Sequence, residues 1–155
     1  LRILYRGAEK SDRDVFLLSG PHDSSTWPWR RLDRWKANAC PMSGFSLHPT
    51  AEGTFTAAWE TRGQVHVGRF DPLAGRAQWT AEAPEKGKNR KLPLAVPGRE
   101  GETLLLWNEE TSAAWQLYDR TGRPAREVGR ATSAAGGRHR AAAFVGSDGK
   151  FRVLY

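Results

Sequence analysis

Carboxylates near the ends of apolar segments are the residues of this sequence that could carry out acid–base chemistry. Glu60 ends the segment Ala57-Ala-Trp-Glu, Glu109 follows the similar segment Leu105-Leu-Trp-Asn, and Asp14 precedes a third apolar run. Cleavage of a glycosidic bond generally needs one carboxyl group as acid and a second as base or nucleophile. Glu60, Glu109 and Asp14 are therefore candidate catalytic residues. The alternative is that Glu60 and Glu109 are solvated charges at strand ends.

Three arginines, Arg6, Arg13 and Arg62, lie in or beside expected connections between strands. A guanidinium group binds a carboxylate through two parallel hydrogen bonds, so several arginines together could hold an acidic ligand. These three residues are candidate ligand-binding residues. The alternative is that an arginine-rich sequence places arginines all over its surface.

The most distinctive local sequence is segment 33–43, which holds Trp35, Asn38 and Cys40. An exposed Trp could stack on a sugar ring, so Trp35 and Asn38 join the candidate ligand-binding residues. The alternative is that Trp35 and Cys40 fill the seam between neighbouring sheets, because a lone buried Cys behaves as a small apolar residue.

The composition predicts a packed domain without a metal or cofactor. The 155 residues are 39% hydrophobic and carry a net charge of +7. The single Cys40 excludes an internal disulfide, and the four histidines lack the spacing of a zinc site. No apolar run approaches the roughly 20 residues that span a bilayer, so we expect no membrane insertion. The start at Leu1, without a signal sequence, indicates a partial segment.

Two basic clusters raise the question of a nucleic-acid partner. They consist of Arg30, Arg31, Arg34 and Lys36, and of Lys86, Lys88, Arg90 and Lys91. Charge runs in loops are usually solvated, and neither cluster is interleaved with exposed aromatic residues in a known nucleic-acid-binding fold. We expect no nucleic-acid partner.

Short apolar runs bounded by Gly, Pro, Asp and Ser predict an all-β fold along the whole chain. The expected strands are residues 1–6, 15–19, 29–32, 44–48, 54–60, 64–70, 77–81, 93–96, 103–107, 113–118, 140–145 and 151–155. Their even spacing predicts a meander of hairpins.

An internal repeat groups these strands. Tyr5, Trp59 and Trp107 end similar strands, 54 and 48 residues apart, and Phe144 begins a shorter fourth copy 37 residues further on. A period near 50 suits one four-stranded blade of a β-propeller, so the chain would hold about three and a half blades. The expected blade segments are 1–32, 43–82, 92–128 and 130–155. Their aromatic strand residues Tyr5, Trp59, Trp107 and Trp115 are expected in the core.

The turns after the third strands carry a family resemblance. Asp71-Pro-Leu-Ala-Gly-Arg-Ala-Gln-Trp79 and Asp119-Arg-Thr-Gly-Arg resemble the Asp-box, the bacterial neuraminidase repeat between the third and fourth strands of sialidase blades. Tyr5-Arg6 with Arg13-Asp14, followed by Trp35-Lys-Ala-Asn-Ala-Cys-Pro-Met42, is also similar to a segment of sialidase-like propellers. The resemblance implies part of a six-bladed propeller from an exported bacterial protein, either secreted or periplasmic.

The resemblance also implies a ligand face, opposite the Asp-box turns, for a carbohydrate such as sialic acid or another acidic glycan. Connections expected there are residues 7–13, 33–43, 61–63, 82–91, 108–112, 128–138 and 147–149. Sialidases use a Tyr nucleophile, and none of Tyr5, Tyr118 and Tyr155 is expected on this face. Two functions stay open, an exo-glycosidase or a non-catalytic propeller that binds glycan or protein through its loop face.

Overall fold

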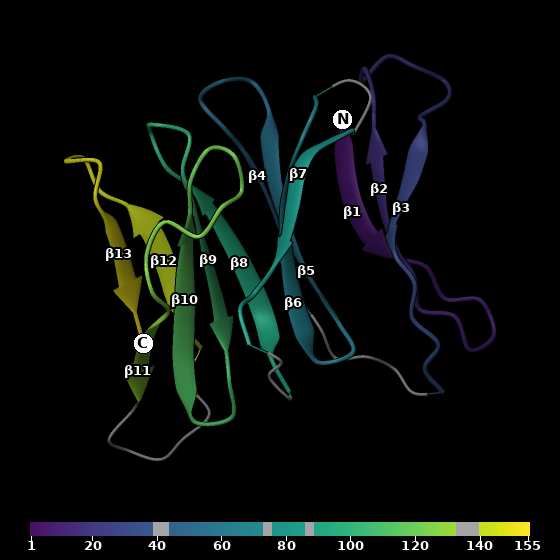
Figure 1. Ribbon diagram of the computed structural model, residues 1–155. Coiled ribbons are helices and arrows are strands. Elements are labelled where there is room, and N and C mark those ends of the chain that lie inside the picture. The colour runs from purple at the N-terminus through teal and green to yellow at the C-terminus, as the bar shows by residue number, and fades with distance from the viewer. Residues whose placement is uncertain (39–43, 73–75, 86–88, 133–139) are drawn as a thin grey trace.

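The structure is a computed structural model that describes residues 1–38, 44–72, 76–85, 89–132 and 140–155. Within these ranges it is all-β, with antiparallel sheets and no helix, which confirms the all-β prediction. The sheets stand side by side in chain order (Figure 1).

Each sheet is a meander of consecutive strands. The first contains β1 (Arg2–Arg6), β2 (Val15–Ser19) and β3 (Trp29–Asp33). The second contains β4 (Phe45–Pro49), β5 (Phe55–Thr61), β6 (Gln64–Phe70) and β7 (Ala77–Glu82). The third contains β8 (Lys91–Pro97), β9 (Thr103–Asn108), β10 (Ser112–Tyr118) and β11 (Gly129–Thr132). The last contains β12 (Ala142–Val145) and β13 (Phe151–Leu154).

The second sheet packs against the first and the third, which explains why every residue of its inner strand β5 is buried. Strands alternate their side chains between two faces, so adjacent residues of β5 enter different cores. One core joins the first and second sheets and contains Val15, Leu17, Phe55, Ala57, Trp59 and Phe70. The other joins the second and third sheets and contains Ala58, Val65, Val67, Ala83, Ala95, Leu105, Trp107, Ala114 and Tyr118.

The β4–β5, β8–β9 and β12–β13 turns show which positions of successive sheets are equivalent. Gly53, Gly101 and Gly149 occupy equivalent turns, 48 residues apart, with φ of 79°, 86° and 77°. This left-handed conformation favours glycine, because a Cβ atom would be strained there. The register places Tyr155, not Phe144, at the position of Trp59 and Trp107. Phe144 lies on β12, which precedes its turn as β4 and β8 precede theirs, so the expected fourth copy beginning at Phe144 is wrong.

Several expected positions are also corrected. Trp59 and Trp107 are buried as predicted, but Trp115 is only half-buried and Tyr5 is exposed. Tyr5 is exposed because none of the described sheets packs against its face of the first sheet. Strand β11 was not expected, and it extends the third sheet beyond the predicted boundary at residue 128.

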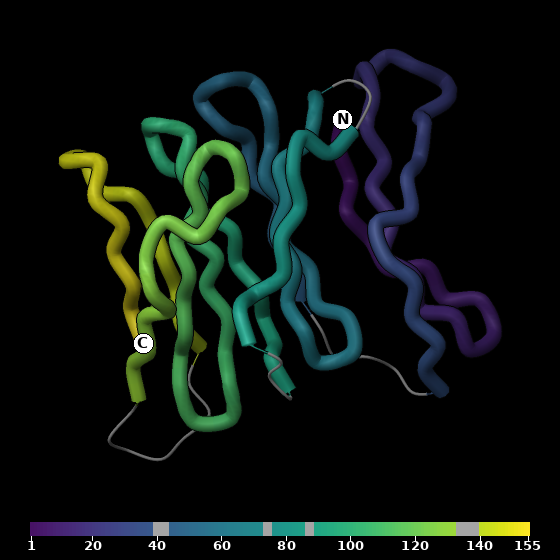
Figure 2. The backbone as a smooth tube through the Cα atoms, in the orientation of Figure 1, coloured from purple at the N-terminus to yellow at the C-terminus, as the bar shows by residue number. Residues whose placement is uncertain are grey.

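Figure 2 shows that the β1–β2, β5–β6 and β9–β10 connections lie at one end of the sheets, as expected. The turn 147–149 instead lies at the opposite end, because it is equivalent to the β4–β5 and β8–β9 turns. There Arg99, in the β8–β9 turn, donates a hydrogen bond to the carbonyl oxygen of Gly146. The end that carries the β1–β2 and β5–β6 connections contains the candidate site.

Candidate functional site

Arg6, at the end of β1, ties the first two sheets together. Its guanidinium donates to the carbonyl oxygen of Arg13 at 2.6 Å and to that of Glu60 at 2.5 Å. It also lies over the rings of Trp35 and Phe45, 4.9 and 5.3 Å from their centroids. Burial lowers the pKa of Arg6, while nearby carboxylates oppose that shift. Arg6 therefore lies at the predicted end of the molecule. There its hydrogen bonds connect β1 to the β1–β2 loop and to β5.

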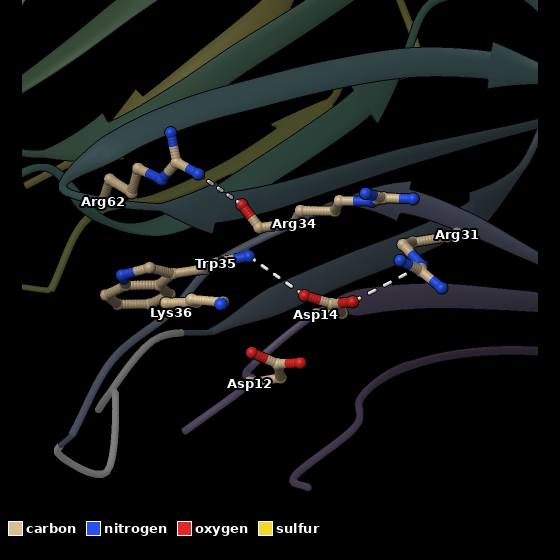
Figure 3. A pocket seen from close by; sticks show the side chains of 7 residues that line it. All are labelled: Asp12, Asp14, Arg31, Arg34, Trp35, Lys36 and Arg62. Atoms are coloured by element: carbon tan, nitrogen blue, oxygen red, sulfur yellow. Dashed lines mark hydrogen bonds and ion pairs between the residues drawn. The ribbon is translucent and has the colours of Figure 1, made fainter. Parts of the chain in front are cut away.

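An open groove of about 440 Å³ lies at the same end of the sheets and includes Trp35 in its lining (Figure 3). Its lining residues are Asp12, Asp14, Arg31, Arg34, Trp35, Lys36 and Arg62. Four of these side chains are cationic and two are carboxylates, so the groove carries an excess of positive charge. The lining comes from the β1–β2 loop, the end of β3 and the β5–β6 turn.

Asp14 holds two walls of this groove in place. Its Oδ1 accepts a hydrogen bond from the backbone N–H of Trp35 at 3.0 Å, and its Oδ2 lies 3.4 Å from Nε of Arg31. The segment that follows β3 is thereby fixed against the β1–β2 loop. In the described part of the chain, neither the guanidinium of Arg34 nor the ammonium of Lys36 makes a hydrogen bond or an ion pair, and both residues are exposed, so both can approach a ligand.

Of the five residues predicted to bind a ligand, Trp35 and Arg62 line the groove. Arg62 lines the groove and donates to the carbonyl oxygen of Arg34 at 2.8 Å. Arg13 turns its guanidinium to its own loop, donating to the carbonyl oxygens of Lys10 and Asp12, each at 2.8 Å. Asn38 is exposed. It precedes residues 39–43, which include Cys40 and lie outside the described residues.

Glu60 is a buried turn-forming residue rather than a solvated charge. It is only 4% exposed, and its Oε1 accepts a hydrogen bond from the backbone N–H of Gly63 at 2.7 Å. The bond closes the tight β5–β6 turn, in which Arg62 and Gly63 have φ of 58° and 76°. This turn presents Arg62 to the groove.

Glu109 occupies the corresponding β9–β10 turn of the third sheet and is also bonded to its own surroundings. It accepts hydrogen bonds from Nε1 of Trp107 at 3.1 Å and from Oγ of Ser112 at 3.3 Å. Nε of Arg90 lies 3.4 Å from its Oε1, and Nε of Arg130 lies 3.7 Å from its Oε2. Each of the three carboxylates predicted to be catalytic thus contacts donors within the chain.

Arg90 was expected in a solvated basic cluster, but it is buried. It donates to Oε1 of Gln64 at 2.8 Å and to the carbonyl oxygens of Pro84 and Glu85, each at 2.9 Å. Its guanidinium lies 5.1 Å from the ring centroid of Trp107. The other basic residues named with it include Lys86 and Lys88, which lie outside the described residues. Arg90 organises the connection from β7 to β8 and packs it against β9.

Asp33 links the groove to the core between the first two sheets. Its Oδ1 accepts from the backbone N–H of Arg34 at 2.7 Å, and its Oδ2 accepts from Nε1 of Trp59 at 3.4 Å. Nε2 of His66 lies 3.5 Å from the same Oδ2, and Nδ1 lies 3.9 Å from Glu82. The His66 ring stacks on Trp59 with a centroid separation of 5.4 Å.

Acidification is expected to destabilise the fold through His66. Burial lowers the pKa of His66, and the carboxylates of Asp33, Glu82 and Glu60 only oppose this shift. The unfolded chain, with a His pKa of about 6.5, then binds the proton more readily than the folded chain. The free energy of unfolding should therefore fall as the pH drops below about 6.5. Urea denaturation at pH values above and below this point measures the fall.

His66→Gln should make this pH dependence shallower, without abolishing it, because burial also lowers the pKa of His48. The exposed His22 supplies the matched control, and His22→Gln should leave the dependence unchanged. An equally steep dependence in His66→Gln and the parent protein would contradict the assignment to His66.

The residues that sequence reasoning missed are those whose partners are distant in the chain. Asp33 and Arg90 act through segments 26 residues or more away, namely Trp59 with its neighbours and Gln64. Arg31, Arg34 and Lys36 did give a signal, the charge run after β3, which we assigned to solvent. Their proximity to Arg62 could not be read from that run.

Comparisons with known proteins found no matching family model, no matching curated protein and no matching solved structure. Across the described ranges, no cluster of three or more His, Cys, Asp or Glu residues could hold a metal ion. A search of the same ranges found no helix with the length and apolar character needed to cross a membrane.

Proposed function

We propose that this chain is part of a β-propeller that binds an acidic carbohydrate in the groove between the β1–β2 loop, the end of β3 and the β5–β6 turn. The propeller proposal is supported by two complete four-stranded meanders with a 48-residue repeat, and by the packing of β8 against both β4 and β5 of the preceding sheet. The sialidase-like turns support an exported bacterial protein, secreted or periplasmic.

The observation that carries the binding proposal is the lining of the groove. Arg31, Arg34, Lys36 and Arg62 surround an open space beside Trp35. Guanidinium groups recognise carboxylates through paired hydrogen bonds, and an indole ring offers an apolar surface to a sugar. The ligand class that fits both features is a sugar with a carboxylate, such as sialic acid.

We propose binding rather than hydrolysis, because the candidate carboxylates are engaged. Glu60 closes its turn, Glu109 binds Trp107 and Ser112, and Asp14 holds Trp35 and Arg31. A glycosidase needs one carboxyl group to donate a proton and another to attack the sugar or activate water. Catalysis by these three residues would require each to leave its partners.

The test is calorimetric titration with N-acetylneuraminic acid and with its methyl ester, which has the same ring but no negative charge. We expect the acid to bind and the ester to bind at least about tenfold more weakly. Arg34→Ala and Arg62→Ala should each weaken acid binding by about tenfold, and added salt should weaken it further. Galacturonic acid tests whether the groove accepts carboxylated sugars as a class.

Arg126→Ala is the matched control, because Arg126 is exposed on the β10–β11 connection, away from the groove. It should leave affinity unchanged. Equal binding of acid and ester, or equal losses in all three variants, would overturn the proposal. Turnover of a fluorogenic sialoside that is lost in Glu60→Gln would replace it with the exo-glycosidase function.

A further inference from the structure

A second hollow adjoins the groove along strand β3. It has a volume of about 550 Å³ and shares Arg31, Arg34 and Arg62 with the groove. Both volumes lie in the range of about 300–1,000 Å³ that is usual for ligand pockets. Because three lining residues are common to both, a ligand in the groove can continue into this second space. We call it the β3 hollow, and its lining residues are Trp29, Arg31, Leu32, Asp33, Arg34 and Arg62.

The shared arginines place positive charge at the boundary between the two spaces. Arg34 extends its guanidinium away from Trp35 and toward Arg31 (Figure 3). Within the described ranges, that guanidinium makes no hydrogen bond or ion pair. The groove adds the ammonium of Lys36 on its own side of the boundary. The two spaces together therefore offer cations to more than one carboxylate.

Each space also has its own tryptophan. Trp35 lines the groove and Trp29 lines the β3 hollow. Trp29 is 61% exposed, so much of its ring surface is open to a ligand. Trp29 begins β3 and Trp35 follows its end, and the strand spans about 13 Å at roughly 3.3 Å per residue. This distance is longer than one sugar ring, so only linked sugars can contact both tryptophans.

Strands β3 and β7 are equivalent outer strands of the first and second sheets. Phe16 and His66 hold the same place in these sheets, because each pairs with the aromatic residue of the repeat. Phe16 also pairs with Arg31 of β3, and His66 also pairs with Glu82 of β7. Arg31 and Glu82 therefore occupy equivalent positions.

This equivalence shows that the β3 hollow does not depend on which sheet precedes the first one. Two residues before Arg31 and Glu82, Trp29 and Thr80 are equivalent as well. Thr80 and Glu82 are both exposed, although the first sheet packs on their face of the second. The outer strand of a sheet thus extends beyond the cover of its neighbour. A sheet packed before the first would leave the β3 hollow accessible in the same way.

We propose that the ligand is an acidic oligosaccharide with carboxylates on at least two successive sugars, bound from Trp35 across the shared arginines to Trp29. This inference rests on the proposed function, because it extends the same groove. A linked chain of sugars gains affinity from both spaces, whereas a single sugar occupies only one. Affinity should therefore increase with the number of linked sugars.

Calorimetric titration with N-acetylneuraminic acid and with its α2,8-linked dimer and trimer tests the length of the site. We expect the trimer to bind at least about tenfold more tightly than the single sugar. Offering three sugars in place of one raises affinity only about threefold by statistics, so a tenfold gain requires contacts in both spaces. The uncharged trimer of N-acetylglucosamine should bind at least about tenfold more weakly than the acidic trimer.

Trp29→Ala separates the two spaces. It should weaken binding of the acidic trimer at least about fivefold and leave binding of the single sugar unchanged, because Trp29 lines only the β3 hollow. Arg30→Ala is the matched control, since it removes an exposed cation of the same strand that lines neither space. It should leave both affinities within about twofold of the parent chain. Circular dichroism of each variant shows that the sheets are intact.

The outcomes separate this inference from the proposed function. Equal affinities for the single sugar and the trimer would overturn the inference and leave the proposed function standing. Equal losses of single-sugar and trimer binding in Trp29→Ala would also overturn it, as would a loss in Arg30→Ala as large as that in Trp29→Ala. If none of the acidic sugars binds, the proposed function fails, and this inference fails with it.

Discussion

Trp107→Ala is expected to lower the free energy of unfolding by about 3–5 kcal/mol, the usual cost of deleting a buried Trp side chain. Trp107 is fully buried in the core between the second and third sheets. The loss would be large beside a total stability of about 5–15 kcal/mol for ordinary domains. Equilibrium urea denaturation followed by circular dichroism measures it, with the parent chain and variants at the same concentration.

Two further variants separate packing from position in this prediction. Trp107→Phe fills much of the space but leaves Glu109 without the indole N–H. Its free energy of unfolding should therefore lie between those of the parent chain and Trp107→Ala. Trp29→Ala removes the same residue type from a site that is 61% exposed, and its cost should be within about 1 kcal/mol. Similar losses for Trp107→Ala and Trp29→Ala would contradict the assigned core.

The strands were predictable because their evidence is local. Strands β5 and β9 read as short apolar runs between turn residues, and both Trp59 and Trp107 are buried as their repeated positions indicate. Strand β11 contains Gly129 and has the sequence Gly-Arg-Ala-Thr, which has little apolar character. It forms because β10 offers a pairing edge, a cause that lies in another segment.

The fate of Tyr5 shows what a repeat cannot reveal. Tyr5 occupies the same place in its sheet as Trp59, so periodicity predicts burial for both. Burial also requires a neighbouring sheet, and only Trp59 has one on that face. Equivalent residues can therefore have different environments when they lie at the end of a stack.

The end of the sheets at which the candidate residues lie was predictable, whereas the contacts that they make were not. Arg6, Arg62 and Trp35 meet at one end of the sheets, as the connections predicted. The guanidinium of Arg6 nevertheless donates hydrogen bonds to the backbone carbonyl oxygens of Arg13 and Glu60. Carbonyl acceptors exist at every residue, so no sequence pattern shows which arginines they will engage. Arg62 likewise donates to the carbonyl oxygen of Arg34, whereas the guanidinium of Arg34 makes no such bond within the described residues.

Arg90 illustrates the same limit, and the stability of the fold should be sensitive to its substitution. We expect Arg90→Met to lower the free energy of unfolding by about 3 kcal/mol or more. The substitution keeps much of the apolar stem over Trp107 but removes donors from Gln64 and from the carbonyl oxygens of Pro84 and Glu85. Buried acceptors that lose their donors cost free energy that packing does not recover.

Arg90→Lys separates the contribution of the planar guanidinium donors from that of the positive charge. An ammonium group keeps the positive charge near Glu109, but it cannot reproduce the planar guanidinium donors that reach several acceptors at once. If the bonds to the carbonyl oxygens dominate, Arg90→Lys should lower the free energy of unfolding about as much as Arg90→Met does. If the ion pair with Glu109 at 3.4 Å dominates, the decrease should be small. Arg126→Met, at an exposed position, controls for loss of one charge and should change stability by at most about 0.5 kcal/mol.

A full rescue by lysine would contradict the assigned role of the carbonyl bonds. Trp107 and Arg90 share contacts, so Arg90→Met and Trp107→Phe should not be additive, and urea denaturation of the double variant measures their coupling. If the coupling is large, the β7–β8 connection and the core fold as one unit. The β7–β8 connection is then stabilised by the same packing that stabilises the interface between the second and third sheets.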